Sequence, residues 1–323
     1  MRVLVLGGTR FVGRGIVARL AAAGHEVRCV HRGTRSHDDL PATHLLVRDR
    51  RELPVHRDAI AAFAPDAVVD VSNSGGEDAE TALEAIPDAA RLVAISSCDT
   101  YRAFASLHGG RQTDALPLTE TSPVREPGDG PQWGNLDVEA RYLARGGTVL
   151  RLGAVYGQGD YQRRFDFVLR RVRAGRARIP VGSGTFLFSH VDVADVAEAV
   201  RLVITDRGAG VEGGEWSARV EGQVFNVAES ATWPYRARAE RVLAAAGSAA
   251  ALVQVDDERL PADLAITGTL SQHLLVSSAK LREVVGWRDG DAEAALAKAV
   301  EWYQQHPPEP EDADFSADDA ALA

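Results

Sequence analysis

The sequence predicts an α/β protein: a doubly wound, parallel sheet followed by a smaller C-terminal α/β domain. Two observations predict this fold class. Short apolar runs alternate with stretches of helical periodicity over the first 155 residues, as happens when helices connect parallel strands. The chain also opens with an apolar run, residues 2–6, that breaks at Gly7 and Gly8 and resumes as a helical segment. That order is typical of a strand, a tight turn and a helix.

The opening turn is a candidate phosphate-binding loop. A helix N-terminus has unpaired N–H groups and a partial positive charge, and glycine lets a pyrophosphate approach the backbone closely. The motif carries Arg10 where a third glycine is common, so by itself it also fits an ordinary strand–helix turn. The residues that we expect to contact a dinucleotide are Gly7, Thr9, Arg10, Phe11, Val12 and Gly13.

The other elements of the first domain follow at regular intervals. The first helix should end at Gly24, a typical residue just beyond a helix C-terminus. We expect strands at 26–31, 44–47, 67–71, 91–96 and 148–152, and helices at 59–64, 77–85 and 134–145. Ligands of parallel sheets bind beyond the carboxyl ends of the strands. Ser72 and Asn73, which follow the fourth strand, should therefore border the cofactor.

The second half of the chain is predicted to be mainly helical. Helices are expected at 165–174, 191–204, 234–246, 278–285 and 292–305, with a late strand at 224–227. The arginines of 165–174 should form a solvated face. The predicted organisation is a dinucleotide-binding domain (1–155, joined again by 186–205 and part of 224–232), a substrate domain (156–305) and an acidic, disordered tail (306–323).

Composition excludes several classes of function. A net charge of −10 disfavours non-specific nucleic-acid binding. Only two cysteines are present, Cys29 and Cys98, so we expect free thiols and neither a disulfide framework nor a metal site. No apolar run has membrane-spanning length, and the N-terminal run is too short for a signal peptide. These features predict a cytoplasmic protein that acts on a small molecule, with no nucleic-acid or membrane partner.

The end of the second strand predicts which nicotinamide cofactor binds. NAD-selective folds place a carboxylate here, whereas an arginine accommodates the 2′-phosphate of NADP. The sequence from His31 to Arg35 contains two arginines and no acidic residue. Arg10 should face the same phosphate as Arg32, so we favour NADP(H) over NAD(H). The alternative is that these arginines are only solvated.

Six segments together resemble the NAD(P)-dependent epimerase/dehydratase family, the extended short-chain dehydrogenase/reductases, in its atypical branch. They are residues 7–13, 95–101, 150–157, 189–197, 225–227 and 281–287. The resemblance spans about residues 1 to 303. It implies a Rossmann domain interlocked with a substrate domain, and it places Asp49 at an adenine contact. It also implies a homodimer formed through a helical face.

The catalytic Tyr-x-x-x-Lys pair of that family is replaced in this chain. The aligned positions are Trp133 and Asp137, and no lysine precedes Lys280. Tryptophan cannot exchange a proton at neutral pH, and an aspartate cannot lower the pKa of a phenol. Asn135 stands where some atypical relatives carry a lysine, and it keeps a hydrogen-bond donor there without the charge.

The resemblance suggests replacements for the lost pair. Ser97 matches the residue that orients the reacting oxygen, and Asp99 or Tyr101 is the candidate proton donor or acceptor. Each of these residues also has a purely structural interpretation. The candidate substrate contacts are Trp133, Tyr156 and Phe186. Phe186 lies near the place of a pyrophosphate-binding arginine, which favours a less charged or more apolar substrate.

Two functional interpretations remain open. The first is an NADP(H)-dependent oxidoreductase or epimerase for a small sugar-like molecule or secondary metabolite, or an enzyme that recycles its cofactor during lyase or isomerase chemistry. The second is a non-catalytic NADP(H)-binding sensor or partner protein, which explains the lost pair most simply. The long aperiodic segment at 96–130 and the substrate domain favour the enzyme, because such segments usually carry function.

Overall fold

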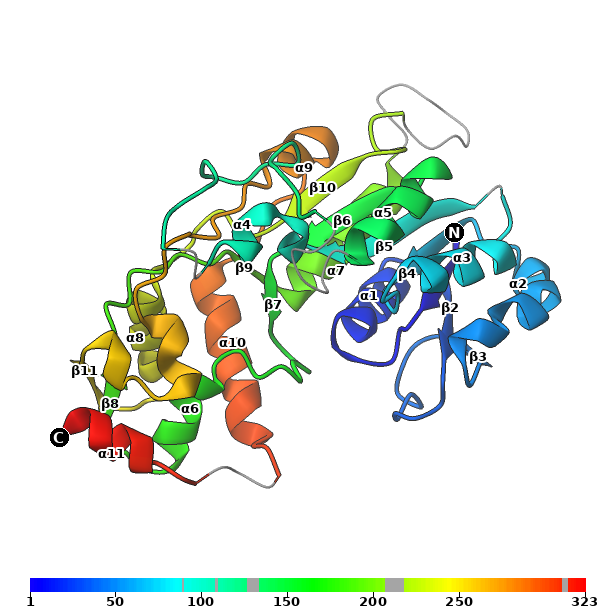
Figure 1. The fold of residues 1–323 in the computed structure, drawn as a ribbon. Coiled ribbons are helices and arrows are strands. Elements are labelled where there is room, and N and C mark those ends of the chain that lie inside the picture. The colour runs from blue at the N-terminus through cyan, green and yellow to red at the C-terminus, as the bar shows by residue number, and fades with distance from the viewer. Residues whose placement is uncertain (89, 108–109, 127–133, 207–217, 310–312) are drawn as a thin grey trace.

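A seven-stranded parallel sheet forms the centre of the computed structural model (Figure 1). The structure describes residues 1–323 except 89, 108–109, 127–133, 207–217 and 310–312. The strand order is β10-β6-β5-β4-β1-β2-β3. The strands are β1 (Arg2–Leu6), β2 (Glu26–His31), β3 (Thr43–Leu46), β4 (Ala67–Asp70), β5 (Arg91–Ser97), β6 (Thr148–Leu152) and β10 (Val224–Val227). This arrangement confirms the predicted doubly wound α/β fold.

Alternate residues of β1 bury opposite faces of the sheet. Val3 and Val5 pack in one core cluster with helices α1 (Phe11–Ala22) and α7 (Val193–Thr205). Leu4 and Leu6 pack in another with the helices of the second face, α2 (Arg57–Phe63), α3 (Gly76–Ala85) and α5 (Gly134–Ala144). A strand covered on both faces must be apolar throughout, which explains the continuous run at the N-terminus. None of the helices in the described residues combines the length and apolar character needed to cross a membrane.

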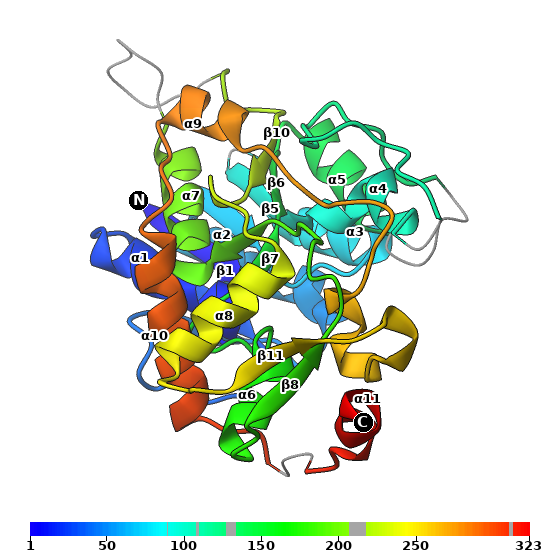
Figure 2. The same cartoon turned by 90° about the vertical axis from the view of Figure 1, so that its left-hand side faces the viewer.

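A second lobe is built from the rest of the chain (Figures 1 and 2). Two short parallel pairs lie in it: β7 (Ala154–Tyr156) with β9 (His190–Asp192), and β8 (Arg178–Val181) with β11 (Ala251–Gln254). Its helices are α4 (Arg102–Ala105), α6 (Asp166–Arg173), α8 (Tyr235–Ala245), α10 (Ala292–Gln305) and α11 (Ser316–Leu322). Helix α9 (Ala279–Val285) lies beside β10 of the central sheet, where Leu281 packs in the same core cluster as α1 and α7. Short 3₁₀ turns lie at Arg50–His56, Cys98–Thr100, Asp257–Arg259 and Ala262–Thr267.

The C-terminal tail differs from its prediction. We expected 306–323 to be disordered, but Ser316–Leu322 forms α11. Asp318 is buried and pairs with the equally buried Arg171 of α6, with 2.7 Å between Asp318 Oδ1 and Arg171 Nη2. The tail is acidic in composition, yet its Asp318 is buried and pairs with a buried arginine. The prediction of a wholly solvated α6 face is wrong at Arg171 for the same reason.

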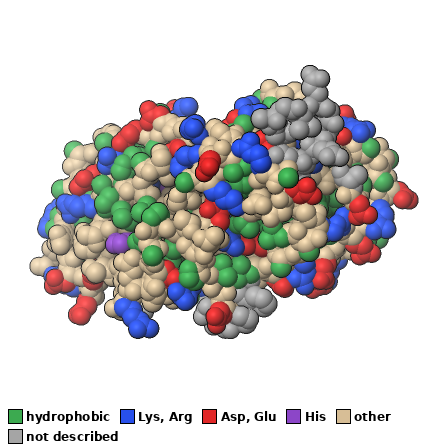
Figure 3. Space-filling view, turned by 90° about the horizontal axis from the view of Figure 1, so that it is seen from above, with side chains coloured by type: hydrophobic (Ala, Val, Ile, Leu, Met, Phe, Trp, Pro, Cys, Tyr) green, Lys and Arg blue, Asp and Glu red, His purple; other side chains and the backbone are tan. Residues whose placement is uncertain are grey.

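The helix predicted at 191–204 begins two residues later than expected. Residues 190–192 form β9 instead. The Asp192 side chain caps α7 by accepting a hydrogen bond from the backbone N–H of Ala194. An aspartate at this position satisfies one of the unpaired N–H groups of the first turn. Acidic and basic side chains are interspersed over the described part of the face in Figure 3.

Candidate cofactor and active site

A cavity of about 780 Å³ lies beyond the carboxyl ends of the central strands. Both lobes contribute to its wall, because Tyr161, Gln162 and Arg164 of the segment after β7 face the Rossmann residues across it. Nine of the residues predicted from the sequence line this cavity: Gly7, Thr9, Arg10, Phe11, Val12, Arg32, Asp49, Ser72 and Ser97.

The glycine turn at the base of the cavity requires its glycines. Gly7 has a φ of +88°, a conformation that L side chains rarely adopt. A Cβ atom on Gly13 would lie 2.1 Å from the carbonyl oxygen of Gly7, so Gly13 packs directly under the turn although it does not line the cavity. Arg10 precedes α1 in extended conformation, and no side chain caps the helix. The first N–H groups of α1 thus remain available to an anion.

Arginines form one wall of the cavity. Arg32, Thr34 and Arg35 follow β2 and line it together with Arg48. Arg10 reaches the opposite lobe, where the carbon of its guanidinium lies 3.3 Å from the centroid of the Tyr161 ring. A cation stacked on an aromatic ring is restrained without losing its charge. This wall therefore presents several positive charges to the cavity.

Asp49 lies in the wall with its carboxylate already engaged. Arg51 donates from Nε to both carboxylate oxygens, at 3.0 and 3.2 Å, and its backbone N–H donates to Oδ1. The side-chain hydrogen bond from Arg51 is the main cause that lowers the pKa of Asp49 to about 2. An adenine contact at Asp49 would have to share these oxygens with Arg51.

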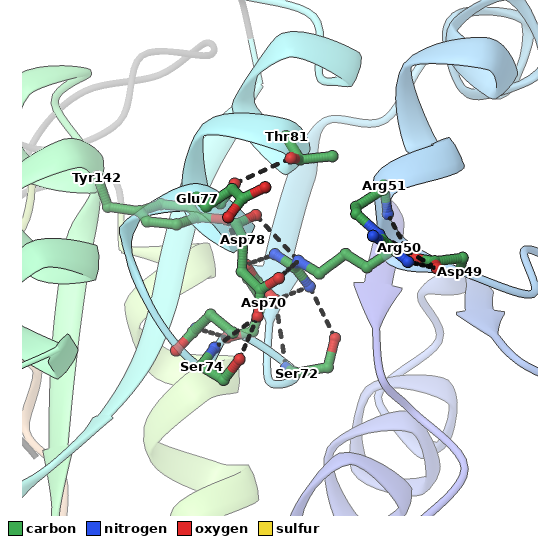
Figure 4. A network of polar contacts seen from close by, with 11 residues as sticks. Asp49, Arg50, Arg51, Asp70, Ser72, Ser74, Glu77, Asp78, Thr81 and Tyr142 are labelled. Atoms are coloured by element: carbon green, nitrogen blue, oxygen red, sulfur yellow. Dashed lines mark hydrogen bonds and ion pairs between the residues drawn. The ribbon is translucent and has the colours of Figure 1, made fainter. Parts of the chain in front are cut away.

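Arg50 is a site residue that sequence reasoning missed (Figure 4). Its Nη1 donates to Asp70 Oδ1 at 3.1 Å and to Ser72 Oγ at 2.8 Å, and its Nε donates to the carbonyl oxygen of Asp78. Tyr142 of α5 donates to the other oxygen of the buried Asp70. The network fixes Ser72 in the cavity wall. The sequence signal for this network was Asp70, the aspartate that ends the apolar run at 67–70.

Asn73 supports the wall but does not line it. Its Nδ2 donates to the carbonyl oxygens of Asp70 and Ile95, both at 3.2 Å, and so links the ends of β4 and β5. The position matches the prediction that this segment borders the cavity, whereas the side chain points into the protein rather than at a ligand.

Ser97, Asp99 and Asn135 meet at the end of β5. The Asp99 backbone N–H donates to Ser97 Oγ at 3.2 Å, and Asn135 Nδ2 donates to Asp99 Oδ1 at 3.1 Å. Burial raises the pKa of the Asp99 carboxyl, while the hydrogen bonds from Asn135 and Ser97 oppose that shift. Ser97 lines the cavity, whereas Asp99 is not among the lining residues and contacts Ser97 through its backbone N–H.

Three other predicted residues do not line the cavity: Tyr101, Tyr156 and Phe186. Tyr101 is buried and donates to Asn226 Oδ1 at 2.7 Å, and desolvation raises its pKa. Tyr156 is buried and donates to Glu229 Oε1 at 2.6 Å. Phe186 stacks on Tyr235 inside the second lobe. Their direct catalytic or substrate contacts therefore have no support in the geometry.

Trp133, the remaining substrate prediction, lies outside the described residues. The first lysine of the chain does not line the cavity either. Lys280 Nζ donates to the Gln223 side chain and to the carbonyl oxygen of Val224, both at 2.9 Å. No lysine is thus found among the described residues of the cavity wall.

The model of the NAD dependent epimerase/dehydratase family matches residues 3–228. The match contains the glycine turn, the strand ends and Ser97. It confirms the resemblance inferred from the sequence motifs, and it joins the cavity to a nicotinamide-dependent family.

Two characterised relatives show partial similarity. The chloroplast stem-loop binding protein of 41 kDa b from Arabidopsis thaliana is 26% identical over 227 residues, which cover 65% of this chain and 57% of that protein. The 2'-dehydrokanamycin reductase of Streptomyces kanamyceticus is 33% identical over 229 residues, covering 65% of this chain and 60% of that enzyme. The similarity thus spans less than two thirds of either relative.

Solved structures share the whole fold. The dTDP-glucose 4,6-dehydratase of Bacillus anthracis, solved in complex with NAD, superposes with a TM-score of 0.73 at 16% identity. The alignment covers 97% of this chain and 100% of the dehydratase. At this level of identity the similarity establishes the architecture and leaves the chemistry to the residues of the site.

Proposed function

The chain belongs to the NAD dependent epimerase/dehydratase family, and from that membership we propose that it is an NADP(H)-dependent oxidoreductase for a small secondary metabolite. One observation carries this proposal. The segment that follows β2 places Arg32, Thr34 and Arg35 in the wall of the cavity above the glycine turn, and it contains no carboxylate. A carboxylate at this place would favour the ribose hydroxyls of NAD, whereas arginines suit a 2′-phosphate.

The residues present fit a dinucleotide. Gly7 and the start of α1 suit a pyrophosphate, because Gly7 lines the cavity and the Arg10 side chain does not cap the first N–H groups of the helix. Arg32 and Arg35 would hold the 2′-phosphate, with Arg10 at its side. When bound, the nicotinamide ring of such a cofactor supplies hydride transfer.

We assign proton handling to the group at the end of β5. Ser97 Oγ would orient the oxygen of the substrate, because Ser97 is the member of this group that lines the cavity. Asp99 would hold or release the proton, since partial burial favours its neutral form. Asn135 positions that carboxyl through its hydrogen bond and cannot replace the lysine charge.

The substrate class follows from the relatives and from the composition of the wall. The kanamycin-pathway relative is, by its name, a reductase of a dehydro compound, and we extend reduction of a small carbonyl compound to this chain. The second candidate is a non-catalytic NADP(H)-binding protein. It is favoured by the burial of Tyr101 and by the lack of a lysine among the described residues of the wall.

The decisive experiment is a fluorescence titration of the protein with NADPH and with NADH. We expect tighter binding of NADPH, and we expect R10A/R32A to weaken NADPH binding by about 10²- to 10⁴-fold with little effect on NADH, because each of the two charge-assisted hydrogen bonds contributes about 1.5–3 kcal/mol. The matched control is R236A/R241A on α8, which removes the same charge from exposed ion pairs of the other lobe. Equal affinity for both nucleotides would reject the NADP assignment.

Catalysis is tested separately. A panel of small ketones and aldehydes, including dehydro-aminoglycosides, is incubated with NADPH and the wild-type protein, D99N or S97A. Turnover that falls in both variants while NADPH binding persists supports the oxidoreductase. Binding of NADPH without turnover of any carbonyl class favours the non-catalytic candidate.

A further inference from the structure

Three potential metal ligands converge between β2 and β3, on the flank of the sheet beside the glycine turn. The register pairs Cys29 of β2 with His44 of β3, and His31 follows two residues after Cys29 on the same face. One ligand atom from each of these three side chains lies within 4.8 Å of the other two. The rings of His31 and His44 each stand close to a third imidazole, that of His37, with centroids 4.3 and 4.6 Å away.

The spacing of the nitrogen atoms suits a tetrahedral ion. His31 Nε2 and His44 Nδ1 are 3.1 Å apart. Two imidazole nitrogens bound to one tetrahedral zinc ion at 2.0–2.1 Å stand roughly 3.3 Å from each other. If the distance between these two nitrogens increases by a few tenths of an ångström, it matches the spacing of two ligands on one metal ion.

One ring nitrogen of His37 is held by the backbone. Its Nδ1 lies 3.0 Å from the carbonyl oxygen of Arg35 and donates to it. The Nε2 atom is then left with its lone pair. Metal-binding histidines commonly use one ring nitrogen in this way, because the carbonyl fixes both the tautomer and the ring orientation.

We propose that Cys29, His31 and His44, with His37 as fourth ligand, form a binding site for a divalent metal ion of the zinc class. A thiolate with imidazoles selects zinc, cobalt or copper over magnesium and calcium. Binding releases the thiol proton of Cys29 to solvent as the sulfur–metal bond forms. It also moves the remaining proton of His31 to Nδ1, so the hydrogen bond that Gly33 now donates to that atom opens.

The site would join three parts of the Rossmann domain. Cys29 Sγ lies against the glycine turn, because a Cβ on Gly8 would stand only 2.6 Å from it. His31 lines the cofactor cavity, and His37 belongs to the segment between β2 and β3. The ion would therefore fix the loop that carries Arg32 and Arg35. The inference does not rest on the proposed activity, since the metal can bind to a protein that lacks turnover.

The test uses Co²⁺ added to the full-length protein after dialysis against a chelator. We expect one equivalent to bind with the visible bands of tetrahedral cobalt and a near-ultraviolet sulfur-to-cobalt charge-transfer band. C29S should lose the charge-transfer band, and H44Q should weaken binding by about 10- to 100-fold or more. C98S, which changes the other buried cysteine, should retain the full spectrum.

Circular dichroism of each variant separates loss of the metal from loss of the fold, and H44Q serves where C29S does not fold. A spectrum typical of octahedral cobalt would overturn the proposal. Failure to bind an equivalent would overturn it as well, and so would a charge-transfer band that survives in both C29S and H44Q.

Discussion

Asn135 Nδ2 donates to Asp99 Oδ1 across 3.1 Å, and this bond ties the start of α5 to the end of β5. From the sequence resemblance, we expect Asn135 to stand where some atypical family members carry a lysine. In this protein the donor at Asn135 serves the carboxyl of Asp99. Tyr101, the other candidate for proton transfer, is bound to Asn226 in the interior. The pair therefore places the proton chemistry of the proposed enzyme on Asp99.

The pH dependence of activity should report on this pair. Asn135→Leu removes a hydrogen bond that stabilises the ionised carboxyl, so the pKa of Asp99 rises and the limb of the kcat/KM profile that follows Asp99 moves to higher pH. Asp99→Asn should lower kcat by about 10²- to 10⁴-fold, the usual contribution of a positioned acid or base. A profile that is the same in Asn135→Leu and wild type would show that Asp99 does not exchange the proton.

The glycine turn should tolerate no side chain at Gly13. Gly13→Ala places a Cβ 2.1 Å from a backbone oxygen, which cannot rotate away. We expect the free energy of unfolding to fall by roughly 3 kcal/mol or more, with loss of dinucleotide binding. Urea denaturation measures the change. Gly75→Ala is the matched control, because its φ is 175° and nothing lies within 4 Å of the added Cβ. Equal stability of the two variants would contradict the geometry of the turn.

Local sequence patterns predicted those elements whose consecutive residues must all be apolar or glycine-rich. The run at 2–6 became β1 with the same bounds, and the residues of 7–12 line the cavity apart from Gly8. A buried parallel strand must be apolar and a turn at its end must be glycine-rich, so both features appear in consecutive residues.

The missed features depend on pairs of residues that are distant in the sequence. Arg50 pairs with Asp70 twenty positions later, and Arg171 pairs with Asp318 after 147. Tyr101 is buried against Asn226, 125 positions on. Periodicity shows that a residue is polar or apolar, but it does not show which partner satisfies a buried polar group. The role of Arg50, the order of the tail and the burial of Tyr101 could therefore be found only in three dimensions.

Glu229 should make stability depend on pH. Tyr156 donates to its Oε1, its Oε2 has no hydrogen-bond partner within the described parts of the chain, and burial raises the pKa of the carboxyl to about 7. Because the folded pKa exceeds the unfolded value of about 4.3, the stabilisation is complete below pH 4.3 and is lost as pH rises through 7. The loss of unfolding free energy amounts to about 4 kcal/mol relative to a group that does not titrate.

Urea denaturation between pH 4 and pH 8 tests this expectation. Glu229→Gln should show a flatter dependence of the free energy of unfolding on pH than the wild type. Glu240→Gln changes an exposed carboxyl of α8 and should follow the wild-type curve. If Glu229→Gln and wild type run parallel, the carboxyl is not protonated in the folded protein near neutral pH.

The docked tail should stabilise the second lobe through one buried charge. Asp318 and Arg171 both have fully buried side chains, and Asp263 also contacts that guanidinium at 2.7 Å. In Asp318→Ala, Arg171 keeps its ion pair with Asp263. We therefore expect the free energy of unfolding to fall by about 3 kcal/mol, the lower end of the range for breaking a buried pair. Asp319→Ala is the control, because this neighbour is 64% exposed where it pairs with Arg176, and exposed pairs contribute about 1 kcal/mol or less, on the order of the experimental error.

Thermal and urea denaturation of the two variants give the comparison. Similar, small losses in both would mean that α11 does not dock on α6 in solution, whereas a loss confined to Asp318→Ala ties the acidic C-terminus to the folded lobe.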